Sequence, residues 1–279
     1  MVNSHLRNME NQVICADCLV AMKDIPDKSI DMILTSPPYD NLRTYNGDST
    51  WNEDIWKEII KELFRIIKVG GVVVWIVGDS TLQGSETGTS FKQALWAKEC
   101  GFNLHDTMIY QKDNPPPVGG TTRYFQHFEY MFVFSKGTPE KFNPICADRR
   151  NKWNDKREYR YKAFVRDKDG NFKKRLVKLT GQVKIGNVWK YVVGGGNSVP
   201  YALGHPATFP EKLAEDHILS WSNEGDTILD PMAGSGTTLK MAKKNNRNYI
   251  GIEISPEYID IINKRLQSEL KAIEEDIIN

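Results

Sequence analysis

The feature that most constrains the fold is a glycine-rich turn between an expected strand and an expected helix. The strand Thr227–Leu229 leads into D-P-M-A-G-S-G-T-T at 230–238, and a helix is expected over Thr237–Asn245. Such a turn lets backbone approach a ligand closely and directs helix N–H groups at an anion. The next strand, Tyr249–Ile252, leads to Glu253, where an acid holds ribose hydroxyls in nucleotide-binding α/β folds. Turn and acid together indicate a nucleoside-bearing cofactor, although the turn alone is equally compatible with a purely structural role.

The turn matches neither of two common phosphate-binding patterns. It lacks the lysine of G-x-x-x-x-G-K-[ST], and Leu239 replaces the third glycine of the dinucleotide pattern after Gly234 and Gly236. A shorter G-x-G turn with a preceding acid suits a ligand whose anionic group is a carboxylate.

Apolar runs alternate with amphipathic stretches along the rest of the chain. The continuous run Val72–Val77 is typical of a strand buried on both faces of a parallel sheet. Apolar residues at helical spacing predict a helix over Asn52–Lys68, which we expect Gly70-Gly71 to end. Further strands are expected at 13–16, 31–34, 104–110 and 130–134, and further helices at 91–100, 211–221 and 256–278. This alternation predicts an α/β fold with a doubly wound, mostly parallel sheet.

A proline-rich loop follows the expected strand Asp31–Leu34. Its residues, Thr35-Ser36-Pro37-Pro38-Tyr39, belong at a carboxyl edge of the sheet, where α/β proteins bind ligands. Two prolines stiffen the loop and remove two N–H donors, so the carbonyls of Ser36 and Pro37 are expected to be fixed acceptors. With the Tyr39 ring beside them, they could orient the exocyclic amine of a nucleobase. An ordinary proline-rich turn is the alternative.

Positive charge is concentrated between Lys136 and Lys190. This block holds 17 Lys and Arg against 6 Asp and Glu, a net charge of +11, whereas the rest holds 20 basic and 30 acidic residues. Aromatic residues such as Trp153 and Phe164 are interleaved with the charges. A basic, aromatic module suits contact with the phosphates and bases of a nucleic acid. A solvated basic surface is the alternative.

Composition argues against several other classes. No apolar run approaches the roughly 20 residues of a membrane span, and the N-terminus has no apolar signal core, so we expect a cytoplasmic protein without a membrane partner. Four cysteines are too few and too scattered for a disulfide scaffold. Cys15 and Cys18 have C-x-x-C spacing, but no second ligand pair is nearby, so no metal site is expected.

The two loops together resemble a known family. S-P-P-Y near the N-terminus, with D-P-x-x-G-S-G-T near the C-terminus, is similar to the amino-group DNA methyltransferases that use S-adenosylmethionine. The catalytic loop comes first, as in the beta arrangement of that family. Segments at 16–19, 127–136 and 205–211 resemble further family motifs, and Met232 stands where the family usually has Phe. The likeness covers nearly the whole chain.

The resemblance implies a role for each motif. The catalytic residues would be Ser36, Pro37, Pro38 and Tyr39, with Tyr39 stacked on a flipped base. The residues that hold S-adenosylmethionine would be Asp17, Thr35, Phe209, Asp230, Met232, Gly234, Ser235, Gly236, Thr237 and Glu253. The residues that bind double-stranded DNA would be Arg149, Arg150, Lys152, Arg157, Lys173, Lys174 and Arg175.

The resemblance also implies a Rossmann-like methyltransferase fold with permuted motif order. A catalytic domain of 1–135 and 199–279 would carry a basic target-recognition insertion over 136–198. Members with Ser at the first position of the catalytic loop mostly modify cytosine N4, so we expect that reaction, with adenine N6 as the alternative. A non-catalytic, cofactor-binding DNA-recognition protein and an RNA substrate are further alternatives. The sequence leaves open the target sequence, a partner restriction endonuclease and the oligomeric state.

Overall fold

The computed structural model describes residues 4–38, 51–114, 122–148, 160–178, 182–192 and 210–278. The chain divides into two compact units. The first comprises Met1–Asn143 with Asn187–Asn279, and the second comprises Pro144–Gly186. The second unit therefore lies wholly inside the basic block of the sequence.

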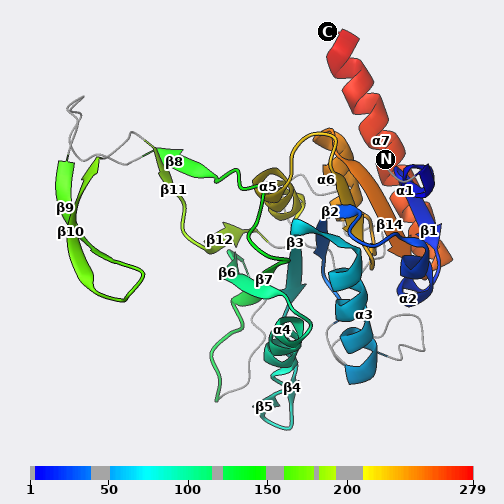
Figure 1. Ribbon diagram of the computed structural model, residues 1–279. Helices are drawn as coiled ribbons and strands as arrows, with labels where there is room; N and C mark the ends of the chain where they lie inside the picture. Colours follow the sequence, from blue (N-terminus) through cyan, green and yellow to red (C-terminus); the bar gives the residue numbers. More distant parts are fainter. Residues whose placement is uncertain are drawn as a thin grey trace. The chain divides into compact units, whose positions relative to one another are not determined.

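An eight-stranded sheet forms the centre of the first unit, in the order β1-β14-β13-β2-β3-β7-β6-β12 (Figure 1). Neighbouring strands are parallel, except that β7 runs antiparallel to both β3 and β6. The strands are β1 (Gln12–Cys15), β2 (Ile30–Thr35), β3 (Ile67–Val77), β6 (Asn103–Lys112), β7 (Phe128–Ser135), β12 (Val188–Tyr191), β13 (Thr227–Asp230) and β14 (Asn248–Glu253). This arrangement confirms the predicted α/β fold with a mostly parallel sheet.

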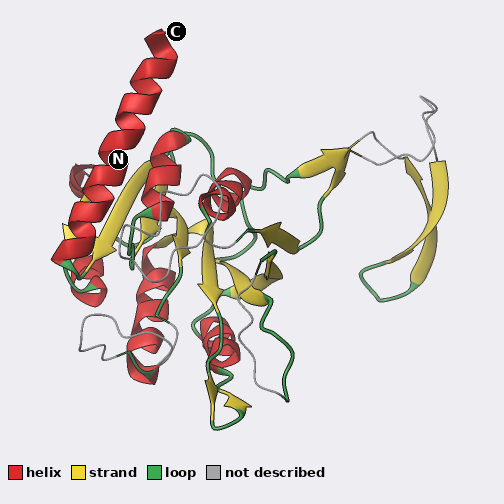
Figure 2. Cartoon of the chain, turned by 180° about the vertical axis from the view of Figure 1, so that it is seen from behind, coloured by secondary structure: helices red, strands yellow, loops and turns green. Residues whose placement is uncertain are grey.

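Helices cover both faces of the sheet (Figure 2). They are α1 (Ser4–Met9), α2 (Cys18–Ala21), the 3-10 turn η1 (Met22–Asp24), α3 (Glu53–Ile66), α4 (Thr89–Glu99), α5 (Glu211–Trp221), α6 (Thr237–Lys244) and α7 (Pro256–Ile278). The short hairpin β4 (Thr81–Leu82) and β5 (Ser85–Glu86) follows β3. Helix α3 contacts α2 and α4, whereas α6 contacts α5 and α7. In the described part of the chain, no helix has an apolar stretch long enough to cross a bilayer.

Burial on both faces of the sheet explains why the sequence of β3 is continuously apolar over Val72–Val77. Val73, Trp75 and Val77 pack in the core cluster that includes α3 and α4, while the intervening Val72, Val74 and Ile76 are buried on the other face. The one polar atom of Trp75, its Nε1, donates a hydrogen bond to Gln93 Oε1 on α4 at 2.8 Å. Burial on both faces therefore confirms the interpretation of this run as a central strand.

Helix α3 ends four residues before the expected glycine pair. Its N-terminus is capped by Asn52, whose Oδ1 accepts from the Ile55 N–H at 3.1 Å, as helix propensity predicts. At the other end Ile67 becomes extended and pairs with Ile30 of β2, so Gly70 and Gly71 lie within β3. The expectation that these glycines end the helix was wrong, because pairing with a neighbouring strand overrides local helix propensity.

The described residues of the second unit form two antiparallel strand pairs. Strand β8 (Cys146–Asp148) pairs with β11 (Gln182–Lys184), and β9 (Arg160–Arg166) pairs with β10 (Phe172–Lys178). The β9–β10 connection turns on Asp167, whose Oδ1 accepts from the Asp169 and Asn171 N–H groups at 3.0 and 2.9 Å. An Asx-type turn of this kind fixes a two-stranded ribbon without a core of its own.

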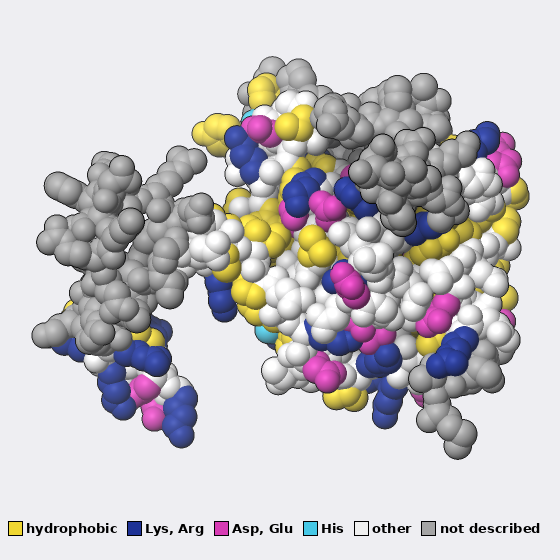
Figure 3. Space-filling model, turned by 90° about the horizontal axis from the view of Figure 1, so that it is seen from above, with side chains coloured by type: hydrophobic (Ala, Val, Ile, Leu, Met, Phe, Trp, Pro, Cys, Tyr) yellow, Lys and Arg dark blue, Asp and Glu magenta, His cyan; other side chains and the backbone are white. Residues whose placement is uncertain are grey.

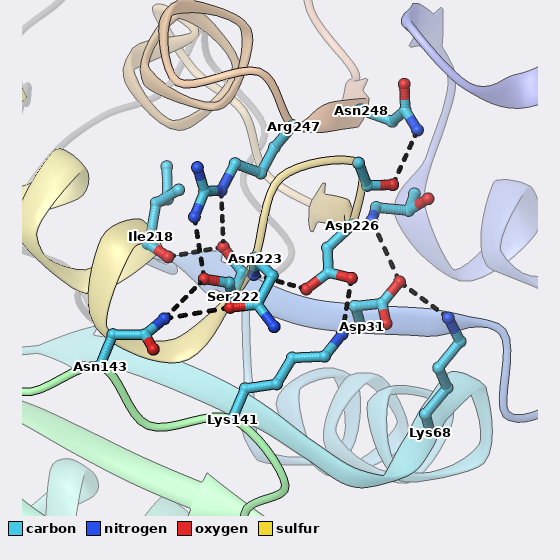
Figure 4. Close-up of polar contacts among 12 residues, drawn as sticks. Asp31, Lys68, Lys141, Asn143, Ile218, Ser222, Asn223, Asp226, Arg247 and Asn248 are labelled. Carbon is cyan, nitrogen blue, oxygen red and sulfur yellow. Dashed lines mark hydrogen bonds and ion pairs between the residues drawn. The ribbon is translucent and has the colours of Figure 1, made fainter.

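The ends of the basic block that precede and follow the second unit belong to the first unit and pack within it. Lys141 Nζ donates to Asp31 and Asp226, at the amino ends of β2 and β13, with distances of 2.9 and 2.6 Å (Figure 4). Asn143 Nδ2 donates to the Leu219 and Ser222 carbonyls at the end of α5, both at 3.1 Å. On the return, β12 joins the sheet beside β6, and Trp189 is buried against the His217 ring at 4.7 Å. These parts of the block are structural.

Candidate active site

The direction of the strand connections changes between β2 and β13. From β2 the chain passes through α3 to β3 on one side, and from β13 it passes through α6 to β14 on the other side. The two strands pair only at Ile228 with Met32 and Leu229 with Ile33. Their carboxyl ends therefore open into the kind of crevice in which open α/β sheets bind ligands. The two motifs singled out in the sequence follow directly from these two strands.

The proline-rich loop follows β2. Ser36 and Pro38 are half-buried and Pro37 is buried, so the described part of the loop is packed rather than extended into solvent. The Thr238 hydroxyl at the start of α6 donates to the Leu34 carbonyl of β2 at 3.2 Å. This bond joins the end of β2, which leads into the proline-rich loop, to the start of α6, which follows the glycine-rich turn. Tyr39, expected to stack on the base, lies outside the described residues, as does Phe209.

The glycine-rich turn reaches α6 through Gly236, which has the left-handed φ of +79°. We expected this glycine to let backbone approach a ligand. The atoms nearest to a Cβ built there instead belong to Ile262 of α7, with two carbons at 3.0 Å. Gly236 is therefore required by the turn conformation and by packing against α7.

Gly251 of β14 allows the close packing of helix on strand that the third glycine allows in the dinucleotide pattern. A Cβ built on Gly251 of β14 would lie 2.3 Å from Leu239 Cδ1 on α6. In the dinucleotide pattern a helix glycine allows close packing of helix on strand. Here the helix carries the large side chain and the strand carries the glycine, so the same close approach is reached with the sizes exchanged.

Two carboxylates lie at this edge of the sheet. Asp230 ends β13, and burial raises its pKa to about 6, although the Thr35 hydroxyl, the Thr238 hydroxyl and the Met232 N–H favour the charged form. Glu253 ends β14 on the neighbouring strand, and burial raises its pKa as well. The Glu253 carboxylate accepts from the Gly234 N–H at 2.8 Å and from the Ser255 N–H at 2.9 Å. The Ile254 N–H also favours its charged form, and a carboxylate offers about four lone pairs, so Glu253 can accept from one further donor.

Thr35, at the end of β2, has a buried hydroxyl beside Asp230. It is close enough to that carboxylate to favour its ionised form, yet among the described residues it finds no partner at hydrogen-bonding geometry. Asp17 follows β1 and is exposed, and its carboxylate accepts from the Leu19 and Val20 N–H groups as the cap of α2. The structure thus brings Asp17, Thr35, Asp230 and Glu253 to the carboxyl ends of four adjacent strands.

The sequence analysis missed the side chain that holds the glycine-rich turn in place, which is Arg265 of α7. Arg265 of α7 is buried, and its Nη1 donates to the Ser235 carbonyl, the Ser235 hydroxyl and the Thr237 hydroxyl at 2.7, 2.9 and 3.3 Å. Its Nη2 donates at 2.7 Å to Glu211, which also pairs with Lys240 at 3.0 Å. Ser235 and Thr237 were expected to hold the cofactor. In the structure both hydroxyls accept from Arg265, which holds the turn in a defined shape.

The donors and acceptors at this edge suit S-adenosylmethionine. Carboxylates at Asp230 and Glu253 suit a ligand that carries positive charge and ribose hydroxyls, and the α6 N-terminus suits its carboxylate. The partly buried Met232 packs against the core cluster beside the turn. Burial and the Asp17 charge raise the pKa of the Cys18 thiol to about 12, so this thiol is protonated near neutral pH.

The expected DNA-binding residues divide between described and undescribed parts of the chain. Lys173, Lys174 and Arg175 are exposed on β10, where Lys174 lies over the Phe164 ring of β9 at 5.4 Å. Lys173 forms an ion pair with Asp167 at 2.9 Å. The remaining four, Arg149, Arg150, Lys152 and Arg157, lie outside the described residues.

Known proteins resemble this chain over most of its length. A family model described as DNA methylase, for N6 and N4 methyltransferases, matches residues 30–264. The orphan methyltransferase M.BamHII of Bacillus amyloliquefaciens is 55% identical over 252 residues, which cover 88% of this chain and 92% of the relative. Two solved structures share the fold. The PvuII DNA methyltransferase (cytosine-N4-specific) has a TM-score of 0.68 at 20% identity, with 91% of this chain and 85% of that chain covered. A putative DNA modification methylase from Thermus thermophilus, complexed with S-adenosyl-L-methionine, has a TM-score of 0.60 at 22% identity, with 92% and 95% covered.

Proposed function

Because this chain belongs to the DNA methylase family of N6- and N4-directed methyltransferases, we propose that it methylates the exocyclic N4 of cytosine in double-stranded DNA. The methyl donor is S-adenosylmethionine. The observation that carries the choice of base is Ser36, a half-buried neutral hydroxyl at the first position of S-P-P-Y, directly after the strand β2 that bonds to the start of α6. A hydroxyl accepts a hydrogen bond more weakly than a carboxylate does, and the resemblance associates Ser at this position with cytosine.

In this reaction the protein mainly has to position the two reactants and stabilise the charge that develops between them. The target amine is paired inside the duplex, so the nucleotide has to leave the helix before it can react. Ser36 Oγ and the Pro37 carbonyl accept from the amine, which draws the nitrogen lone pair out of conjugation with the ring, while Tyr39 stacks on the base. S-adenosylmethionine supplies an electrophilic methyl group on a sulfonium. The amine proton can leave after attack, so no strong base is required beforehand.

The cofactor is assigned to the crevice between β2 and β13. Glu253 would accept from a ribose hydroxyl, since its carboxylate can take a further donor beside the Gly234, Ser255 and Ile254 N–H groups. Asp230 would face the methionine part together with the Thr35 hydroxyl, which has no partner among the described residues, and Asp17 would face the adenine. The backbone N–H groups of the turn, held in place by Arg265, would receive the carboxylate.

Contact with DNA is assigned to the ribbon β9–β10 of the second unit. Dark blue Lys and Arg side chains gather on its described part in Figure 3. Arg166 lies over the Phe172 ring at 4.8 Å, which pairs a cation with an exposed aromatic surface on one face of the ribbon. A two-stranded ribbon of this width fits the major groove of B-DNA, and its cations would neutralise phosphates.

Mass spectrometry of nucleosides tests the proposed reaction. DNA from a host without its own methyltransferases, incubated with the protein and S-adenosylmethionine, should yield N4-methylcytosine after digestion. Ser36→Ala should slow transfer without abolishing it, because the Pro37 carbonyl remains, and its cofactor affinity should match the wild type. N6-methyladenine would contradict the choice of base, and unmodified DNA from every source tested would contradict the enzymatic function.

The same DNA, sequenced for modified positions, would give the recognition sequence. The M.BamHII relative is named an orphan methyltransferase, and that name gives no support for a partner endonuclease.

A further inference from the structure

The loop that leads into β7 exposes aromatic side chains to solvent. In the segment Arg123–His127, which leads into β7, the Tyr124 side chain is fully exposed and Phe125 is 53% exposed. The Phe125 and His127 rings are stacked nearly parallel, 6.4 Å apart. We call this segment the aromatic loop. Single exposed apolar residues are ordinary, but adjacent exposed rings in one short loop mark an interaction surface.

The sheet register places the aromatic loop at the edge that carries the catalytic loop. Thr35 of β2 pairs with Trp75 of β3, and Val77, two residues further along β3, pairs with Tyr130 of β7. Because β7 is antiparallel, the residues before Phe128 continue past this same edge. Only β3 separates β2 from β7, so the two loops leave the sheet about two strand spacings, or about 10 Å, apart.

Arg123 fixes the aromatic loop to a second projection of this edge. Its guanidinium donates to the Gly84 carbonyl in the β4–β5 hairpin and lies 3.7 Å from the Glu86 carboxylate. The hairpin follows β3 at the same end of the sheet (Figure 1). Leu82 of the hairpin is 50% exposed. The contacts of Arg123 therefore hold the aromatic loop against the β4–β5 hairpin, which lies about forty residues earlier in the chain.

We propose that the aromatic loop stacks on the DNA bases that lose their neighbour when the target nucleotide leaves the helix. This inference rests on the proposed function, because only a flipped substrate leaves such a gap. Rings suit the gap because every base offers a π face, so stacking makes no demand on sequence. The partner that fits is a duplex opened at the target, with Tyr124 and Phe125 against the remaining stack.

Kinetics on two duplexes test the proposal. Both contain the recognition sequence, and in the second a pyrene nucleotide opposite the target fills the gap. On the paired duplex, kcat/KM should fall about tenfold for Tyr124→Ala or Phe125→Ala and about 100-fold for both. On the pyrene duplex the variants should return close to the wild-type value, because pyrene takes the place of the rings. Tyr124→Phe, which keeps the ring, should behave as wild type on both duplexes.

Leu95→Ala is the matched control, since Leu95 is 60% exposed in the middle of α4. It should change neither rate, and S-adenosylmethionine affinity should be constant throughout the series. Undiminished activity of the double variant on paired DNA would overturn the proposal, and so would an equal loss on both duplexes. A change in sedimentation without a change in kinetics would also overturn it, by assigning the rings to contact between copies of the chain. A wild-type protein that methylates neither duplex would instead reject the proposed function on which this inference rests.

Discussion

At the scale of single residues, the buried Asp230 carboxylate carries a cost in stability. Its side chain is buried at the end of β13, where burial raises the pKa to about 6. The folded protein therefore binds this proton more tightly than the unfolded chain does. Stability falls as the pH rises from about 4 to 6, and above pH 6 the ionised group costs the fold about 3 kcal/mol. A group kept at such a cost fits a ligand site.

Asp230→Asn should raise the melting temperature at pH 7.5 and weaken S-adenosylmethionine binding. The amide is neutral at every pH, and its oxygen can still accept from the Met232 N–H. Calorimetric melting at pH 7.5 and pH 4.5 checks the cause, since the advantage of the variant should largely disappear at the lower pH. An advantage of the same size at both values would show that charge burial is not its source.

At the scale of elements, helix α7 determines the shape of the glycine-rich turn. Arg265 bonds to Ser235, Thr237 and Glu211 from a buried position, so replacing it removes several hydrogen bonds at once. Arg265→Met should destabilise the protein by about 2–4 kcal/mol and weaken S-adenosylmethionine binding. Arg265→Lys should recover only part of both losses, because an ammonium keeps the charge but cannot span three acceptors.

Titration calorimetry with S-adenosylmethionine and thermal melting check this prediction. Lys244→Met is a suitable control, because Lys244 of α6 pairs with Glu215 at an exposed position, and such pairs contribute little. If Arg265→Met bound the cofactor with wild-type affinity, the turn would hold its shape without α7.

Helix α5 packs through a buried histidine on the strand that follows the second unit. Burial lowers the pKa of His217 to about 3, and its Nε2 lies 3.2 Å from Met131 Sδ. The unfolded chain binds this proton below about pH 6.5, so stability is lost as the pH falls from 6.5 towards 3. By pH 4.5 the loss should reach about 3 kcal/mol.

His217→Phe keeps a ring against Trp189 and removes the titration. Acid unfolding followed by circular dichroism should therefore shift to lower pH in this variant. His105→Phe is the control, since His105 is exposed and lies against Trp221. An unchanged acid midpoint in the His217 variant would assign acid sensitivity to other groups.

At the scale of the whole molecule, positive charge is concentrated in the segment Lys136–Lys190, which contains the second unit. Replacing Lys173, Lys174 and Arg175 by Gln should weaken binding to any duplex. It should also reduce the slope of log K against log salt by about 0.9 for each phosphate contact removed. Cofactor affinity should be unchanged. Fluorescence anisotropy with labelled DNA at several salt concentrations measures both quantities.

The control replaces three exposed lysines of the first unit, Lys23, Lys98 and Lys264, by Gln. This variant has the same net charge as the test variant, so it separates a local contact from a general charge effect. Equal salt slopes for the two variants would contradict the assignment of the ribbon β9–β10 to the DNA interface.

The sequence by itself determined the features that depend on local chemistry. Strict apolar runs, helical spacing and glycine-rich or proline-rich turns gave the central strand β3, the bounds of α5 and α7, and the α/β fold. The placement of the proline-rich loop and the glycine-rich turn at one edge of the sheet was also predicted, because the carboxyl ends of parallel strands meet at one edge wherever the strands lie in the sheet. The excess of positive charge over Lys136–Lys190 was visible for the same reason, since charge is a property of composition.

Only the tertiary structure decided which residues of these segments pack against other elements and hold the fold together. Gly236 and Gly251 meet side chains of α7 and α6, and Arg265 reaches the turn from about thirty residues away. Lys141 and Trp189 belong to the basic block, yet they pack within the first unit. These roles depend on contacts between segments far apart in the chain, and such contacts leave no local pattern of spacing or composition. Periodicity specifies the elements, whereas packing between them specifies the partners of each side chain.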